Sequence, residues 1–188
     1  MVADGGIGKA YGAMLTVPSI AIAQDYYDLF QSVIAGNESV KVSERTKMIL
    51  PDFPKVAITY SISENEESSL DNQTKMASSI ADYNAMYGTS YSLENMRAYN
   101  QNVNARLARK SEQYHHRAEQ IDLIIVVDRL LTGFEAPCIS TLFIDRPPMS
   151  APNIIQAFSR TNRLFDQKKT FGQIVTFQTP LMFTEAVN

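Results

Sequence analysis

Residues 156–163 read QAFSRTNR and hold the side chains of this chain best suited to bind an anion. Gln156, Arg160 and Arg163 are four and three residues apart, so in a helix they leave one face within roughly 60° of one another. Arginine is permanently charged, and its planar fork matches the oxygens of a phosphate. Such a face either is solvated and paired with a nearby aspartate, or it grips a phosphate.

A second polar segment, LLTGFEAP at residues 130–137, directly follows a predicted buried strand. In open α/β sheets, ligands bind outside the carboxyl ends of the strands. Thr132 offers a hydroxyl at this position, and Gly133 lets the backbone come close to a ligand. The alternative is an ordinary turn that ends at a proline. A helix over residues 152–163 is expected to begin near the same edge, and this nearness favours a phosphate site over a solvated helix face.

The elements that must position these groups alternate between strands and helices. A helix begins after Ser19, a suitable N-cap, and ends at Gly36. Near-continuous apolar runs at 122–127 and 141–144 are typical of strands buried on both faces of a parallel sheet. Further strands are predicted at 12–17, 55–62 and 172–177. The fold class is therefore predicted to be α/β, with a doubly wound, mostly parallel sheet of about five strands.

A long polar segment at residues 64–120 is predicted to form two inserted helices, broken at residues 87–90. Its tyrosines either stack on bases or pack between helices, which is the commoner use of such rings. Its basic residues from Arg106 to Arg117 either contact phosphate or complement a helix dipole. His115, His116 and Glu119 lack the spacing of a metal site, so an exposed helix end is favoured.

The composition limits the class of protein. The chain has 188 residues, a formal net charge of -3 and one cysteine, Cys138. An internal disulfide is therefore excluded, and no field of positive charge indicates nucleic-acid binding by itself. The longest apolar runs are much shorter than the ~20 residues that span a bilayer. We expect a soluble, cytoplasmic protein with one domain over residues 1–188, a flexible leader at 1–11, and a core at 121–178 that contains both polar segments.

Three segments together resemble a known family. They are AMLTVPSIAIAQDYYDLF, then IDLIIVVDRLLTGFEAP with TLFIDRP, and finally NIIQAFSRTNRLFDQKKTFGQIVTF. Over residues 12–177 the chain resembles the second RecA-like motor domain of the restriction (R) subunit of type I restriction-modification enzymes. These subunits are superfamily 2 DNA translocases. The first segment looks like motif IV, LLTGFEAP like motif V, and QAFSRTNR like motif VI.

This resemblance implies a role for seven residues. In the parent subunit, the arginine fingers that reach the triphosphate across a cleft between domains would be Arg160 and Arg163. The residues near the nucleotide would be Gln156, Gly133 and Glu135, although the acidic position is often Asp in the family. The residues that face DNA would be Ser19 and Thr132. No metal ligand is implied.

The resemblance also implies what the chain lacks. The segment GGIGK at residues 5–9 is not a phosphate loop, because Ala3 stands where the first glycine should be and Ala10 replaces the hydroxyl. ATP and Mg²⁺ would therefore be bound by the intact parent and not by this chain alone, which we expect to be inactive by itself. The parent would be a DNA-dependent ATPase and a type I site-specific deoxyribonuclease, which translocates double-stranded DNA before cleavage.

The implied partners are the first RecA-like domain and the nuclease domain of the same subunit, the methylation and specificity subunits, and double-stranded DNA. No membrane is implied. Two alternatives remain open at this stage. One is a non-catalytic module that binds proteins through the inserted helices, and the other is the motor domain of a different superfamily 2 helicase.

Overall fold

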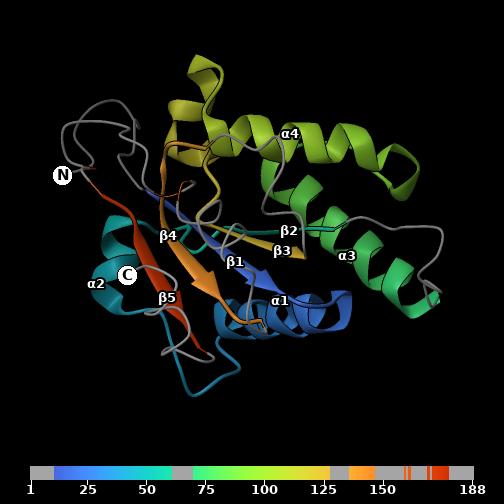
Figure 1. The fold of residues 1–188 in the computed structure, drawn as a ribbon, viewed down its shortest axis with the longest axis horizontal. Helices are drawn as coiled ribbons and strands as arrows, with labels where there is room; N and C mark the ends of the chain where they lie inside the picture. The colour runs from blue at the N-terminus through green and yellow to red at the C-terminus, as the bar shows by residue number, and fades with distance from the viewer. Residues whose placement is uncertain are drawn as a thin grey trace.

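Five parallel strands form the centre of the molecule, in the order β2-β3-β1-β4-β5 (Figure 1). The computed structural model describes residues 11–60, 70–127, 136–146, 159, 161, 169 and 171–177. The strands are β1 (Gly12–Val17), β2 (Val56–Thr59), β3 (Leu123–Val127), β4 (Ile139–Ile144) and β5 (Gln173–Thr176). The predicted parallel sheet of about five strands is therefore confirmed.

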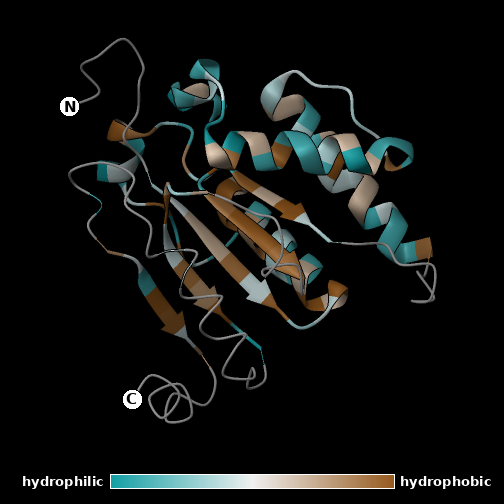
Figure 2. Cartoon of the chain, turned by 45° about the horizontal axis from the view of Figure 1, so that its top comes forward, coloured by the Kyte–Doolittle hydropathy of each residue, from teal (hydrophilic) through white to brown (hydrophobic). Residues whose placement is uncertain are grey.

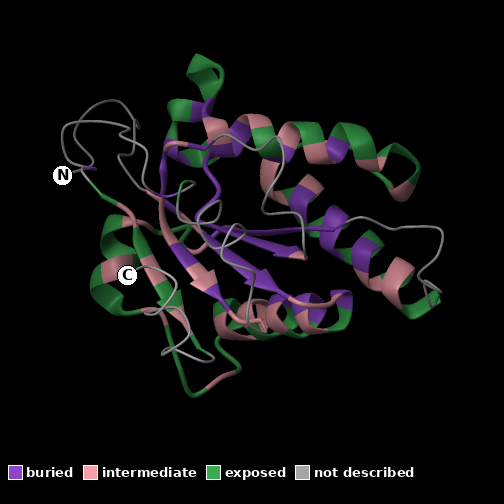
Figure 3. Ribbon diagram, in the orientation of Figure 1, coloured by how far each residue is buried: buried purple, intermediate pink, exposed green. Residues whose placement is uncertain are grey.

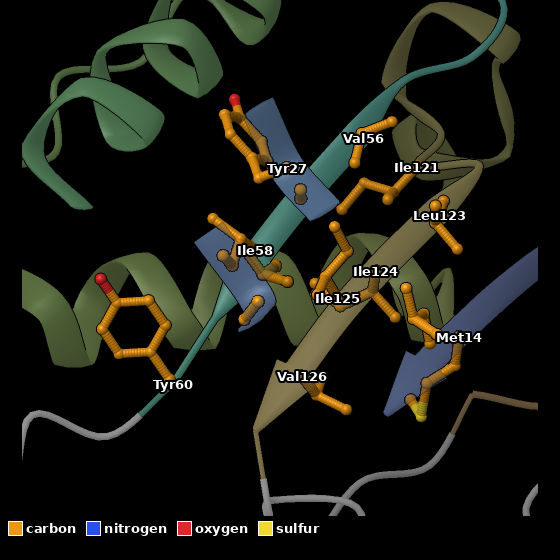
Figure 4. Packing of buried hydrophobic residues seen from close by; sticks show 14 of the residues in the cluster. Met14, Tyr27, Val56, Ile58, Tyr60, Ile121, Leu123, Ile124, Ile125 and Val126 are labelled. Atoms are coloured by element: carbon orange, nitrogen blue, oxygen red, sulfur yellow. The ribbon is translucent and has the colours of Figure 1, made fainter. Parts of the chain in front are cut away.

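The core is built on β1 and the strands on either side of it. Met14 of β1 pairs with Ile124 of β3 and with Leu142 of β4, and all three side chains are buried. Ile58 of β2 lies beside Ile125 of β3 (Figure 4). Full burial of one such side chain is worth about 1.5–3 kcal/mol. The apolar strands run through the middle of the molecule, while polar residues lie on the outer helices (Figure 2).

Helix α1 (Ile20–Ala35) connects β1 to β2 and has the predicted boundaries. The Ser19 hydroxyl accepts a hydrogen bond from the Ile22 amide at 3.3 Å, which satisfies one free donor of the first turn. Gly36 ends the helix in the left-handed conformation, with φ of 80°. Ile20, Ala23 and Tyr27 turn one face of the helix into the core.

The six-residue helix α2 (Glu44–Ile49) was not predicted from the sequence. Ser43 caps it, because its hydroxyl accepts from the Thr46 amide at 3.1 Å. None of its residues is buried (Figure 3). A helix without a buried face produces no apolar periodicity, which was the signal that identified α1.

Two longer helices, α3 (Leu70–Tyr87) and α4 (Met96–Ala108), confirm the predicted inserted pair and the break between them. Gly88 ends α3 at a φ of 63°. Short 3-10 turns follow at Leu93–Asn95, Glu112–His115 and Arg117–Glu119. The rings of Tyr83 and Tyr99 meet edge to face between the two helices, with centroids 5.0 Å apart. These tyrosines therefore pack between helices, as the commoner use of such rings suggested.

A buried ionic network joins the starts of β2 and β3. The Arg117 guanidinium donates to Asp122 at 2.7 Å through Nη2 and to Asp52 at 3.0 Å through Nε. Asp122 also accepts from the Lys55 backbone amide at 2.8 Å, and the Lys55 ammonium lies 2.9 Å from Asp52. Burial would raise the pKa of Asp52, but the hydrogen bond from Lys55 and the charge of Arg117 outweigh it and hold this pKa below its usual value. The network therefore fixes two strand starts and the preceding turn together.

Replacing Arg117→Met should destabilise the fold by about 3–5 kcal/mol, because it leaves the buried Asp122 carboxylate without its cation. The matched control is Lys47→Met, which removes an exposed ion pair with Glu44 and should cost less than about 1 kcal/mol. Urea unfolding followed by circular dichroism measures both variants. Similar small losses for the two would contradict a structural role for the buried network.

Candidate functional site

The carboxyl ends of β1, β3 and β4 lie side by side at one edge of the sheet. Val17 at the end of β1 pairs with Val127 at the end of β3, and Thr16 pairs with Ile144 at the end of β4. Ser19 follows β1 by two residues, so it lies next to the point where the chain leaves β3 for residues 128–135. Ser19 therefore lies near the end of β3, whereas Thr132 lies outside the described residues.

Ser19 has the geometry of a residue that could contact an anion. Its side chain is half-buried, and its hydroxyl already accepts the hydrogen bond from Ile22. A hydroxyl that accepts one bond still has its own hydrogen to donate. The first turn of α1 contains no acidic residue, and its free amides carry the positive end of the helix dipole. The first turn of α1 itself therefore contributes no negative charge that would repel a phosphate oxygen.

Tyr26 and Asp145 connect α1 to the end of β4 at the same edge. The Tyr26 hydroxyl donates to the Asp145 carboxylate at 2.7 Å. The Asp145 backbone amide donates to the carbonyl oxygen of Thr16 at 3.0 Å. Burial first, and then the neighbouring Asp145 carboxylate, raise the pKa of Tyr26 to about 12, so this phenol remains a donor at neutral pH. The sequence reasoning did not identify this pair, because its members are 119 residues apart.

Most of the predicted site residues lie outside the described part of the chain. These residues are Thr132, Gly133, Glu135, Gln156, Arg160 and Arg163. Between the two arginines, however, Thr161 is described and is helical, as is Ser159. Thr161 is 1% exposed, whereas Ser159 is exposed. Thr161, which lies between the two arginines in the sequence, is therefore packed against the rest of the protein.

The contacts of Thr161 show where that turn lies. A Cβ atom built on Gly172 would be 2.4 Å from the Cβ of Thr161, and Gly172 directly precedes β5. Thr161 therefore lies at the amino end of β5, while Ser19 lies at the carboxyl end of β1, and these are opposite edges of a parallel sheet. A helix over residues 152–163 would be about 18 Å long. A helix of that length that begins at the carboxyl edge, as predicted, would be long enough to reach the other edge.

Two basic residues of the inserted segment, Arg106 and Arg117, are not available to bind a phosphate. Arg106 is 4% exposed, and its guanidinium contacts the Glu119 carboxylate and lies 3.9 Å from the centroid of the Tyr87 ring. Arg117 is buried in the ionic network described above. Both arginines are therefore structural. Within the described ranges, no group of three potential ligands could hold a metal ion, and His115 contacts the backbone oxygen of Arg109.

A membrane-spanning helix is also absent from the part of the chain that the structure describes, where none of the helices is long and apolar enough. The described part of the chain is a parallel α/β domain with Ser19 at the carboxyl edge of the sheet and Thr161 at the amino edge.

Comparison with known proteins identifies the family. Residues 9–179 match the family described as type I restriction enzyme subunit R domain 3, so the chain belongs to this family. The match includes all seven predicted site residues, and it confirms the resemblance to the R subunit that the sequence motifs indicated.

Individual relatives are similar over most of this chain. It is 28% identical over 173 residues to the SauMRSORF196P endonuclease subunit of Staphylococcus aureus (strain MRSA252), a type I restriction enzyme subunit. It is 31% identical over 176 residues to the corresponding SsaAORF53P subunit of Staphylococcus saprophyticus. Each alignment covers 90% of this chain and 17% of the relative. The chain thus spans about a sixth of the length of these curated relatives.

Two solved structures show weaker likeness. One is S. cerevisiae Dbp5 bound to RNA and ADP BeF3, with a TM-score of 0.44, 14% identity, and coverage of 97% of this chain and 32% of that one. The other is the ATP-dependent type ISP restriction-modification enzyme LlaBIII bound to DNA, with a TM-score of 0.33, 15% identity, and coverage of 91% and 12%. The fold assignment given above depends on the strand order and on the family match.

Proposed function

We propose that this chain is the second motor domain of a type I restriction R subunit and that it completes an ATP site held mainly by another part of that subunit. The observation that carries the proposal is the family match over residues 9–179, in a chain whose 188 residues contain no phosphate-loop motif. A domain with phosphate-suited arginines but no such loop can contribute to hydrolysis only beside a domain that binds the nucleotide.

In this proposal Arg160 and Arg163 act as arginine fingers. Their guanidinium groups stabilise the negative charge that develops on the γ-phosphate as the phosphoryl group is transferred. Stabilisation by an arginine finger can raise the rate of hydrolysis by several powers of ten. Gln156, Gly133 and Glu135 lie near the nucleotide. When bound, Mg²⁺ supplies charge neutralisation on the phosphates, and its ligands come from outside this chain.

The same proposal assigns the carboxyl edge to double-stranded DNA. Ser19 and Thr132 contact the phosphate backbone there, with Ser19 placed at the amino end of α1 and beside the exit of β3. Contacts of this kind position a protein on DNA without reading its sequence. Ser19 and Thr161 lie at opposite edges of the sheet, so the proposed DNA contact of Ser19 is separate from the position of Thr161.

The wider context of the proposal is a cytoplasmic, multi-subunit restriction enzyme. The domain would work with the first RecA-like domain and the nuclease domain of its own subunit, and with the methylation and specificity subunits. ATP hydrolysis would drive translocation of DNA before cleavage. The isolated chain would hydrolyse no ATP.

Substituting Arg160→Ala in the full-length R subunit should reduce DNA-stimulated ATP turnover by roughly 10³-fold or more, because the charge on the γ-phosphate loses its cation. A coupled phosphate-release assay measures the turnover, and circular dichroism checks the fold. The matched control is Arg97→Ala, which removes an exposed arginine on α4 and should leave turnover unchanged. Near-normal turnover by Arg160→Ala would defeat the assignment.

Substituting Ser19→Asp should weaken DNA binding by the R subunit without loss of stability. Aspartate is as good an N-cap as serine, so the start of α1 is preserved, but its charge repels a phosphate. The matched control is Ser43→Asp at the N-cap of α2, which should not change DNA affinity. Fluorescence anisotropy at several salt concentrations gives the affinity and its salt dependence.

Equal DNA affinity for Ser19→Asp and the unmodified subunit would remove Ser19 from the DNA surface. If the chain itself also shows no salt-dependent binding to DNA, a protein-binding module becomes the better description.

A further inference from the structure

Gly172 lies so close to Thr161 that position 172 has no room for a side chain. A Cβ atom on Gly172 would lie 2.4 Å from the Cβ of Thr161 and 2.5 Å from both its carbonyl oxygen and its hydroxyl oxygen. Real Cβ atoms essentially never come within 3.0 Å of such atoms. The glycine is therefore required by this contact, since it lets the helical turn at Thr161 rest directly on the backbone that leads into β5.

Lys169 holds the same residue from a second direction. Its side chain is 3% exposed, and its ammonium donates a hydrogen bond to the Thr161 carbonyl oxygen at 2.7 Å. Burying an ammonium group is costly unless the group is hydrogen-bonded. An apolar side chain of similar length could supply the packing, but only the lysine can donate the hydrogen bond to the Thr161 carbonyl oxygen. It fixes the position of one backbone carbonyl.

We propose that Lys169 and Gly172 are positioning residues for the arginine turn, and that they act by clamping Thr161. This inference rests on the proposed function, in which Arg160 and Arg163 act on ATP. Arg160 directly precedes Thr161 in the chain, and Arg163 follows it by two residues. A fixed Thr161 backbone therefore limits how far the chain at these two positions can be displaced.

The clamp matters for rate because arginine fingers must be accurately placed. A displacement of about 1 Å, even one caused by a change far from the reacting atoms, can cost on the order of 100-fold in turnover. Lys169 touches neither nucleotide nor metal in this account. Its effect passes through the Thr161 backbone to the residues on either side.

The test uses Lys169→Met in the full-length R subunit, since methionine keeps the length of the side chain and removes the donor. We expect the kcat of DNA-stimulated ATP hydrolysis to fall roughly 10- to 100-fold. The matched control, Lys110→Met, removes an exposed lysine just after α4 and should leave kcat unchanged. All assays are run well below the melting temperature of each variant. Gly172→Ala is the second variant and should lower kcat in the same way.

A double-mutant cycle separates positioning from a general loss of folded protein. The background carries Arg160→Lys and Arg163→Lys, which keep the charges but lose the planar fork. If Lys169 acts through the arginines, Lys169→Met should cause less than about a threefold further loss in this background. A loss of folded protein would instead multiply equally in both backgrounds.

The outcomes are distinct. Unchanged kcat for Lys169→Met, or the same fold-loss in both backgrounds, would overturn the positioning role while leaving the proposed function intact. Normal turnover by the subunit with both arginines replaced would instead overturn the proposed function, and this inference would fall with it.

Discussion

All five strands of the described sheet run in one direction. The carboxyl ends of the strands therefore lie at one edge of the sheet and the amino ends at the other, and this arrangement determines which residues can lie together. It gathers the ends of β1, β3 and β4 at a single edge, where Ser19 and the Tyr26–Asp145 pair lie. It also requires each return connection to cross the whole sheet. For that reason the turn containing Thr161 lies beside the start of β5 and not beside Ser19. The parallel topology therefore places Thr161 and Ser19 at opposite edges of the sheet.

The opposite edge of the sheet is held by charge and not only by apolar packing. Arg117, Asp122, Asp52 and Lys55 connect the starts of β2 and β3 to the turn that follows the inserted helices. Such groups are expensive to bury unless every charge is paired. Arg117, which looks like part of a phosphate-binding surface in the sequence, is therefore used internally, whereas Lys110 of the same basic run is exposed. The inserted helices are thereby anchored to the same sheet that positions the candidate site.

Some of these features could be predicted because local chemistry determines them. Ser19 and Gly36 set the ends of α1 through their own cap interactions, and the apolar runs of β1 and β3 follow from burial on both faces. Helix α2 could not be predicted, since none of its residues is buried. Strand β4 begins at Ile139, two residues before the predicted start, because pairing of Gly12 with Ile139 extends the ladder past the continuous apolar run.

The clamp on Thr161 shows a different limit of sequence reasoning. Lys169 follows another lysine in a polar stretch, and nothing in the sequence distinguishes the two. Gly172 looks like an ordinary residue before a strand until its distance from Thr161 is known. Both roles arise from a tertiary contact over eight to eleven residues that no periodic pattern encodes. The residue types suited to phosphate chemistry could be predicted, but the groups that support them could not.

The central claim is that this domain supplies arginines to a nucleotide bound mainly by another part of the R subunit. It is tested most directly by an experimental structure of the full-length subunit with DNA and a non-hydrolysable ATP analogue. The account predicts a guanidinium nitrogen of Arg160 or Arg163 at about 3 Å from a γ-phosphate oxygen, with Thr161 still seated on Gly172. A nucleotide contacted only by residues outside this chain would contradict it.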